Sequence, residues 1–178
     1  MATAAGGRVR FPSRRWTTPP GTAWLPVHWR ARCWPVPGAR VLYVEDSRVV
    51  AAATKRMLER QELEVLHFTE GEGALDYLRG GHARGVVGAD LVLTDVYLKG
   101  QLSGIDLLAE IRGPLGYSKR ALPVLVMTGD ANTDNQSQLL RDGANDLVLK
   151  PIEERLLVTK ALFQLRVARL PEQPSFQS

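Results

Sequence analysis

The 178-residue sequence contains one cysteine, Cys33, and no long run of apolar residues. A single cysteine excludes an internal disulfide framework and fits a reducing compartment, so we expect a cytoplasmic protein. No apolar stretch approaches the roughly 20 residues that span a bilayer. The N-terminus also lacks a continuous apolar core of signal-peptide length. The sequence therefore predicts a protein without a membrane span.

Acidic residues are absent from the first 40 positions, which hold seven Arg, six of the eleven Pro and all four Trp. Repeated proline excludes a long helix, so we expect a disordered or extended tail over residues 1–39. The other positions carry 16 basic and 19 acidic residues, a net charge of −3. The overall charge of +4 therefore originates in the N-terminal segment, and the remainder is mildly acidic.

The composition of this tail allows three interpretations. Its Arg and Trp side chains could bind nucleic acid or an anionic membrane surface through charge and stacking. The Arg-bearing, acid-poor composition is also similar to that of a transit peptide, although the prolines oppose an amphipathic helix. A third interpretation is translated upstream sequence without a selected role. The acidic remainder of the chain argues against nucleic acid as the main partner.

From residue 40 onward, apolar runs alternate with helical periodicity. We expect strands to start near residues 41, 63, 90, 122 and 146, and helices near 47–61, 70–79, 103–112, 132–142 and 152–168. The runs are short and rich in Val and Leu, which indicates strands buried on both faces. Five strand-then-helix units predict an α/β domain over residues 40–169, with a doubly wound parallel sheet. Residues 170–178 are predicted to be a short polar tail.

Local signals refine the helices. Ser47 and Ser103 are placed to act as N-caps of the first and third helices. The first helix is expected to bury one face, formed by Val50, Ala53 and Met57. The fourth helix is almost wholly polar from residue 132 to 138, so Leu139 and Leu140 must anchor it, and it should open at low free energy. Residues 80–88 are predicted to form a flexible loop.

Polar residues stand where four of the apolar runs end. They are Glu45 and Asp46 after the first strand, Asp95 after the third, Thr128 after the fourth and Lys150 after the fifth. In a 2-1-3-4-5 strand order the first and third strands are neighbours, and ligands bind at that sheet edge. Three carboxylates so close repel one another unless a cation lies among them. Oxygen ligands of this kind suit Mg²⁺ better than Zn²⁺.

The same residues suit phosphoryl transfer. Asp95 is central among them and can act as a nucleophile, because a carboxylate can form an acyl phosphate. Lys150 is a compact positive charge that could reach a phosphoryl oxygen, and Thr128 supplies a hydroxyl donor. Together with a metal ion, these groups would offset the charge of a transferred phosphoryl group.

At these positions the sequence resembles the receiver domain of two-component response regulators. The resemblance covers residues 40–169 and rests on Glu45-Asp46, Asp95, Thr128, Gly143-Ala144 and Lys150-Pro151. It implies a flavodoxin-like fold of five strands in the order 2-1-3-4-5 and five helices. It also implies that Asp95 accepts a phosphoryl group from a sensor histidine kinase or phosphotransfer protein. In that family Asp46, Asp95 and the backbone carbonyl of Tyr97 would ligate Mg²⁺, Glu45 would act through water, and the Lys150-Pro151 bond is usually cis.

Two positions depart from the family pattern. Leu147 stands where the family usually has a Tyr or Phe that rotates as a switch, so the usual coupling of Thr128 to an aromatic ring is not expected. The loop after Asp95 lacks the common Met-Pro turn and places Tyr97 beside the acceptor. We hypothesise that the Tyr97 side chain shields an acyl phosphate and slows its hydrolysis.

These observations predict a single-domain response regulator that is a signalling protein rather than a conventional enzyme. Its expected output is phosphorylation-dependent contact with a downstream protein through the face of the fourth helix, fifth strand and fifth helix, with a homodimer as a further alternative. One competing hypothesis is a pseudo-receiver, an interaction module that never accepts a phosphoryl group. The other is nucleic-acid binding by the basic tail under control of the receiver.

Overall fold

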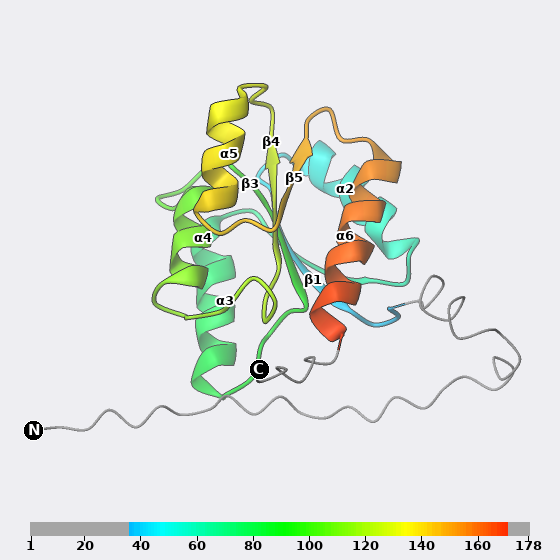
Figure 1. The fold of residues 1–178 in the computed structure, drawn as a ribbon. Coiled ribbons are helices and arrows are strands. Elements are labelled where there is room, and N and C mark those ends of the chain that lie inside the picture. Colours follow the sequence, from blue (N-terminus) through cyan, green and yellow to red (C-terminus); the bar gives the residue numbers. More distant parts are fainter. Residues whose placement is uncertain (1–35, 171–178) are drawn as a thin grey trace, which may run out of the picture.

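The computed structural model describes residues 36–170. The predicted tails therefore lie outside the described residues over positions 1–35 and 171–178. The core is a parallel sheet in the order β2-β1-β3-β4-β5 (Figure 1). Its strands are β1 (Arg40–Val44), β2 (Glu64–Phe68), β3 (Leu91–Asp95), β4 (Val124–Thr128) and β5 (Asp146–Leu149). This is the predicted strand order, and with the five helices that follow the strands it confirms the doubly wound, flavodoxin-like α/β fold.

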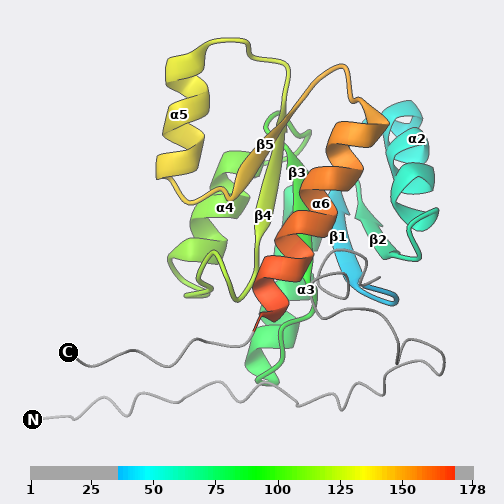
Figure 2. The ribbon, with the colours of Figure 1, turned by 45° about the vertical axis from the view of Figure 1, so that its right-hand side comes forward.

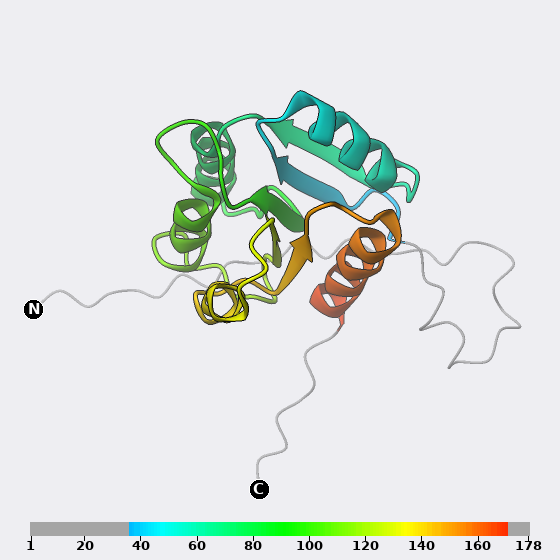
Figure 3. The same ribbon diagram turned by 90° about the horizontal axis from the view of Figure 1, so that it is seen from above.

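Five helices connect and follow the strands. They are α2 (Arg48–Glu59), α3 (Gly71–Ala83), α4 (Gly104–Arg112), α5 (Thr133–Arg141) and α6 (Glu154–Arg169). Helices α3, α4 and α5 cover one face of the sheet, and α2 and α6 cover the other (Figures 2 and 3). None of the helices within residues 36–170 combines the length and apolar character that crossing a membrane requires.

Each face of the sheet has its own apolar core, because successive strand residues point to opposite sides. Leu42 and Val44 of β1 pack with α3, α4 and α5, whereas Val41 and Tyr43 pack with α2 and α6. The three central strands are therefore buried on both faces, as their Val- and Leu-rich runs predicted. Val36 and Ala39 precede the predicted start of the domain. Both are nevertheless buried in the core between the sheet and helices α2 and α6.

The two predicted serine caps are confirmed. The Ser47 hydroxyl accepts a hydrogen bond from the Val50 amide at 3.5 Å. Ser103 forms a full capping box with Asp106, because each side chain accepts a bond from the backbone amide of the other residue. Such caps satisfy amide groups that would otherwise lack partners at a helix start. Both caps belong to helices that follow the strands carrying the acidic residues.

Two local predictions were wrong. The buried face of α2 consists of Ala51, Thr54 and Leu58 instead of Val50, Ala53 and Met57. Helix α3 continues to Ala83, so the first part of the predicted loop 80–88 is helical. Glycine at position 81 of this helix leaves room for the chain that turns back across it, because a side chain there would meet the Val86 carbonyl oxygen at 3.0 Å.

Helix α5 is lightly anchored, as its polar sequence predicted, and its opening at low free energy stays a prediction. Leu139 is its one buried side chain, and Leu140 is partly exposed. The helix begins with Asn132 as N-cap, whose side chain accepts bonds from the amides of Asp134 and Asn135. The N-cap bonds stabilise the first turn of α5, and Leu139 is the one side chain that the helix buries in the core.

Candidate metal and phosphoacceptor site

The sheet register brings the predicted polar residues to one end of the molecule. Val44 is paired with Thr94, Asp95 with Met127, and Thr128 with Leu149, so the strands end level with one another. This end faces the viewer in Figure 3. Since Glu45 and Asp46 follow β1 directly, they lie next to the end of β3, as the strand order predicted.

Three carboxylates meet at this edge. Oxygen atoms of Glu45, Asp46 and Asp95 all lie within 4.8 Å of one another. Glu45 is 1% exposed and Asp95 is 6% exposed, whereas Asp46 is only half-buried. The Ser47 amide donates a hydrogen bond to Glu45 Oε1 at 3.1 Å. Two buried carboxylates and one accessible carboxylate thus form a cluster that is open toward solvent on the Asp46 side.

Lys150 contacts both buried carboxylates of this cluster and offsets part of their charge. Its ammonium lies 2.5 Å from Asp95 Oδ2 and 3.1 Å from Glu45 Oε2. Burial lowers the pKa of Lys150, but the hydrogen bonds and charges of Asp95 and Glu45 outweigh burial and hold it above its usual range. Lys150 is therefore charged at neutral pH. The bond from Lys150 to Pro151 is cis.

The backbone around Asp95 is held closely. The Tyr97 amide donates to Asp95 Oδ1 at 3.4 Å, and the Val96 amide donates to the Met127 carbonyl at 3.0 Å. Gly104 starts α4 directly beside the end of β3, and a side chain there would lie 1.8 Å from the Asp95 carbonyl oxygen. A side chain cannot be accommodated at this distance, so position 104 requires glycine unless the backbone shifts.

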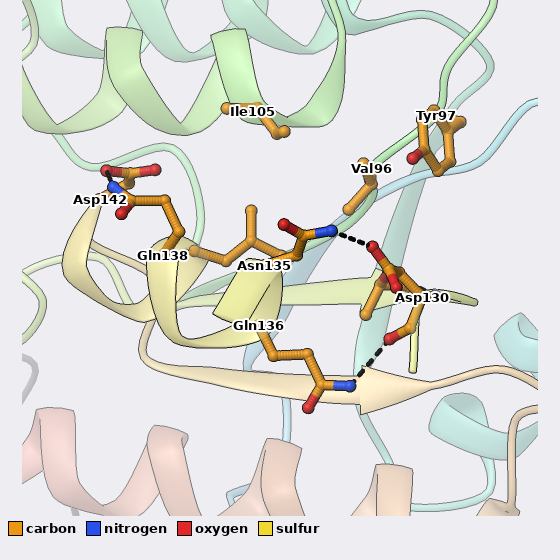
Figure 4. A pocket seen from close by; sticks show the side chains of 10 residues that line it. Val96, Tyr97, Ile105, Asp130, Asn135, Gln136, Gln138 and Asp142 are labelled. Atoms are coloured by element: carbon orange, nitrogen blue, oxygen red, sulfur yellow. Dashed lines mark hydrogen bonds between the residues drawn. The ribbon is translucent and has the colours of Figure 1, made fainter. Parts of the chain in front are cut away.

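Thr128 is buried and its hydroxyl oxygen accepts a hydrogen bond from the Asp130 amide at 3.0 Å. Asp130 in turn accepts bonds from Asn135 Nδ2 at 2.6 Å and, through its carbonyl, from Gln136 Nε2 at 2.8 Å (Figure 4). The bonds from the Asn132 amide and the Asn135 side chain hold the pKa of Asp130 below its usual range. A polar chain of contacts therefore connects Thr128 to the first turn of α5.

A cavity of about 240 Å³ adjoins Thr128 between α4 and α5. Its walls include Val96, Ile105 and Leu139, and Tyr97 lies at its rim (Figure 4). The Tyr97 side chain is 73% exposed. Leu147, at the family's switch position, is 8% exposed and packs in the core on the same face as Leu139. Its side chain has neither the ring nor the hydroxyl that a rotating aromatic switch uses.

One charged contact at the site was missed by sequence reasoning. Lys99 lies in the loop after Asp95, is 82% exposed, and places its ammonium 3.2 Å from Asp46 Oδ2. An isolated lysine in a loop predicts only a solvated charge, so the sequence held no signal for this pairing. The carboxylate cluster is therefore flanked by two lysines, one half-buried and one at the surface.

The donor set fits a hard divalent cation. It consists of three carboxylates in one cluster, without histidine or cysteine, and Mg²⁺ prefers such oxygen ligands together with several waters. Zinc sites use sulfur or nitrogen ligands far more often. Glu45, Asp46 and Asp95 are therefore the three residues whose carboxylates could hold such an ion.

The fold and this edge define a class of protein: a doubly wound α/β domain with an acidic cluster and a lysine at the carboxyl ends of its strands. Residues 41–162 match the model of the response regulator receiver domain. This match covers more than half of the chain, so the chain belongs to the receiver-domain family.

Several curated proteins are similar to the chain. The autoinducer 2 sensor kinase/phosphatase LuxQ of Vibrio vulnificus is 33% identical over 120 residues, which are 67% of this chain and 13% of LuxQ. The transcriptional regulatory protein CseB of Streptomyces coelicolor is 32% identical over 71% of this chain and 49% of CseB. The two-component response regulator ARR7 of Arabidopsis thaliana is 30% identical over 66% of this chain and 58% of ARR7. The chain thus spans between about an eighth and three fifths of these relatives.

Solved structures agree with the fold. A putative response regulator from Chloroflexus aurantiacus is 28% identical with a TM-score of 0.62, covering 72% of this chain and 98% of that chain. The receiver domain of a putative LuxO repressor from Vibrio parahaemolyticus is 26% identical with a TM-score of 0.63, covering 74% and 93%. Both likenesses cover nearly the whole of the solved chain.

Proposed function

We propose that this receiver accepts a phosphoryl group on Asp95 and signals by phosphorylation-dependent contact with another protein. The observation that carries the proposal is the convergence of Glu45, Asp46 and Asp95 within 4.8 Å, with the Lys150 ammonium 2.5 Å from the acceptor. The donor is a phosphohistidine of a sensor histidine kinase or phosphotransfer protein. LuxQ, a sensor kinase/phosphatase similar over 120 residues, supports a partner of this class.

In the proposed reaction, a carboxylate oxygen of Asp95 forms a bond to phosphorus while the phosphorus–nitrogen bond of the donor breaks. The electron pair of that bond returns to the histidine nitrogen. Mg²⁺, held by Asp46, Asp95 and the Tyr97 carbonyl with Glu45 acting through water, would offset charge on the phosphoryl oxygens. Lys150 holds the acceptor carboxylate in place and neutralises negative charge. The Thr128 hydroxyl donates a hydrogen bond to the transferred group.

The proposed output surface is formed by α5, β5 and α6. Leu149 ends β5 with its side chain half-exposed, and Leu156 and Phe163 are more than half-exposed on α6. Positions 156 and 163 are seven residues apart and therefore share one face of the helix. Lys160 lies between them and pairs with Asp146 of β5 at 2.6 Å, which places this face beside the strand. Exposed apolar side chains of this kind suit contact with a protein.

The test uses acetyl phosphate as the donor. The full chain is incubated with acetyl phosphate and Mg²⁺, and intact mass is measured before and after mild alkali. We expect one added phosphoryl group that is lost in alkali and absent from Asp95→Ala. Asp142→Ala, which removes an exposed carboxylate at the C-cap of α5, is the matched control and should be modified normally. A chain that takes up no phosphoryl group would support the pseudo-receiver hypothesis instead.

A further inference from the structure

Helix α3 is hydrogen-bonded to the loop that follows Asp95. Glu72, in the first turn of α3, accepts hydrogen bonds through its Oε1 atom from the amides of Gln101 and Leu102, the latter at 3.2 Å. These amides belong to a segment about 30 positions further along the chain. Both bonds go to a carboxylate, and charged acceptors form stronger hydrogen bonds than neutral ones. A hydrogen bond from the backbone of Glu72 itself, together with those from the Gln101 and Leu102 amides, holds the pKa of Glu72 below its usual range.

Two glycines permit this contact. Gly100 has a φ of +120°, and a side chain there would lie 2.8 Å from Glu72 Oε2. Gly71 precedes the glutamate, and a side chain there would lie 2.9 Å from the Leu102 carbonyl oxygen. Glu72 Oε2 is buried against this backbone and has no hydrogen-bond partner within residues 36–170. The start of α3 and residues 100–102 are thus packed backbone against backbone around one carboxylate.

The gripped loop carries groups of the acidic site. Tyr97, whose carbonyl is the proposed metal ligand, lies four residues before Gln101. Lys99, whose ammonium contacts Asp46, lies two residues before it. At the start of the loop, the Val96 amide donates a hydrogen bond to the Met127 carbonyl and fixes the backbone there. Fixing its far end at Gln101 and Leu102 restricts the conformations open to the residues between.

We propose that Glu72 is a positioning residue for the phosphoacceptor site: it holds the loop so that the Tyr97 carbonyl faces the metal position. This inference rests on the proposed function, because it assumes that Mg²⁺ binds at Asp46 and Asp95. Outer contacts of this type orient metal ligands, and their loss typically lowers metal affinity by about 10- to 100-fold. The hydrogen bonds to Glu72 position only one backbone ligand among several. We therefore expect their loss to lower Mg²⁺ affinity by about tenfold, the lower end of that range.

The experiment compares Glu72→Ala and Glu72→Gln with the unchanged protein. The control is Glu70→Ala, which removes a carboxylate two residues away whose side chain makes no capping bond. Amide hydrogen exchange at Gln101 and Leu102 reports the grip, and calorimetric titration with Mg²⁺ reports the site. We expect faster exchange and about tenfold weaker Mg²⁺ binding in Glu72→Ala. Glu72→Gln keeps an acceptor oxygen, so it should retain part of the slow amide exchange and part of the Mg²⁺ affinity. Glu70→Ala should leave the exchange and the Mg²⁺ affinity unchanged.

The outcomes separate this inference from the proposed function. If exchange at Gln101 and Leu102 accelerates while Mg²⁺ affinity stays unchanged, Glu72 is a structural anchor and the inference is overturned. If the unchanged protein neither binds Mg²⁺ nor accepts a phosphoryl group from acetyl phosphate, the proposed function itself fails. Gly100→Ala provides a second route to the same loop, because its strained φ and the contact with Glu72 should displace the carboxylate without removing it. It should weaken Mg²⁺ binding as Glu72→Ala does.

Discussion

Replacing Lys99 by methionine should strengthen Mg²⁺ binding at the acidic site. The Lys99 ammonium lies 3.2 Å from Asp46 Oδ2, so a cation that binds Asp46 must compete with it. Methionine keeps the length of the side chain and removes only the charge. The direction of the effect therefore follows from charge alone.

The exposure of the pair sets the magnitude. The Lys99 side chain is 82% exposed and that of Asp46 is 20% exposed, which places the contact among surface ion pairs. Such pairs contribute about 0.2–1 kcal/mol, which corresponds to about a 1.4- to 5-fold change in a binding constant. Salt weakens interactions between exposed charges. The gain in affinity should therefore be largest in dilute buffer and close to absent at about 1 M salt.

The assay is a calorimetric Mg²⁺ titration of both proteins at low and high NaCl. Lys55→Met is the matched control, because Lys55 pairs with Glu59 on the surface of α2 at 3.7 Å and its loss changes the net charge equally. We expect Lys55→Met to bind Mg²⁺ like the unchanged protein. The reasoning is refuted if Lys99→Met binds Mg²⁺ no more tightly than the unchanged protein in dilute buffer, or if both variants gain equally.

Three further predictions concern other parts of the domain. Tyr97→Asn should shorten the half-life of the acyl phosphate several-fold by admitting water, as followed by the loss of the added mass, and an unchanged half-life would contradict the shielding hypothesis. Arg112→Met should lower the free energy of unfolding, measured by urea denaturation, by about 3 kcal/mol. The cause is that the carbonyls of Gly143, Tyr117 and Leu122 lose their hydrogen-bond donor. A loss below about 1 kcal/mol would show that water replaces the guanidinium. Asp106→Asn should lower the melting temperature at pH 6 but not in strong acid, because hydrogen bonds with Ser103 hold the pKa of Asp106 below its usual range. The contribution of the carboxylate is then lost as the pH falls through that folded-state pKa. An equal difference at both pH values would argue against the charged capping box.

The sheet and the positions of Glu45, Asp46, Asp95, Thr128 and Lys150 could be predicted because they follow local rules. Short runs of Val and Leu mark strands buried on both faces, and in a parallel sheet their carboxyl ends share one edge. Residues that directly follow such runs are placed at that edge by the sheet itself. The arrangement of the carboxylates therefore required no knowledge of the helices.

Contacts between distant segments could not be predicted in this way. Glu72 and Leu102 are 30 residues apart, and nothing in either local sequence indicates that a glutamate in the first turn of α3 accepts bonds from the loop after β3. The buried face of α2 was predicted wrongly for a different reason. Thr54 is 1% exposed at its centre, and a polar side chain breaks the apolar period that marks a buried face.

The single buried leucine of α5 sets a scale for how often this helix leaves the sheet. Burying a leucine contributes about 1.5–3 kcal/mol, which corresponds to an undocked population of about 0.6–8% if Leu139 alone held the helix. The polar bonds around Asp130 lower that population and connect it to Thr128. With Leu147 in place of an aromatic ring, we expect a partner that favours the undocked helix to act on this small population. A difference of a few kcal/mol in partner affinity between the two positions of α5 would then be enough to make the minor position the main one.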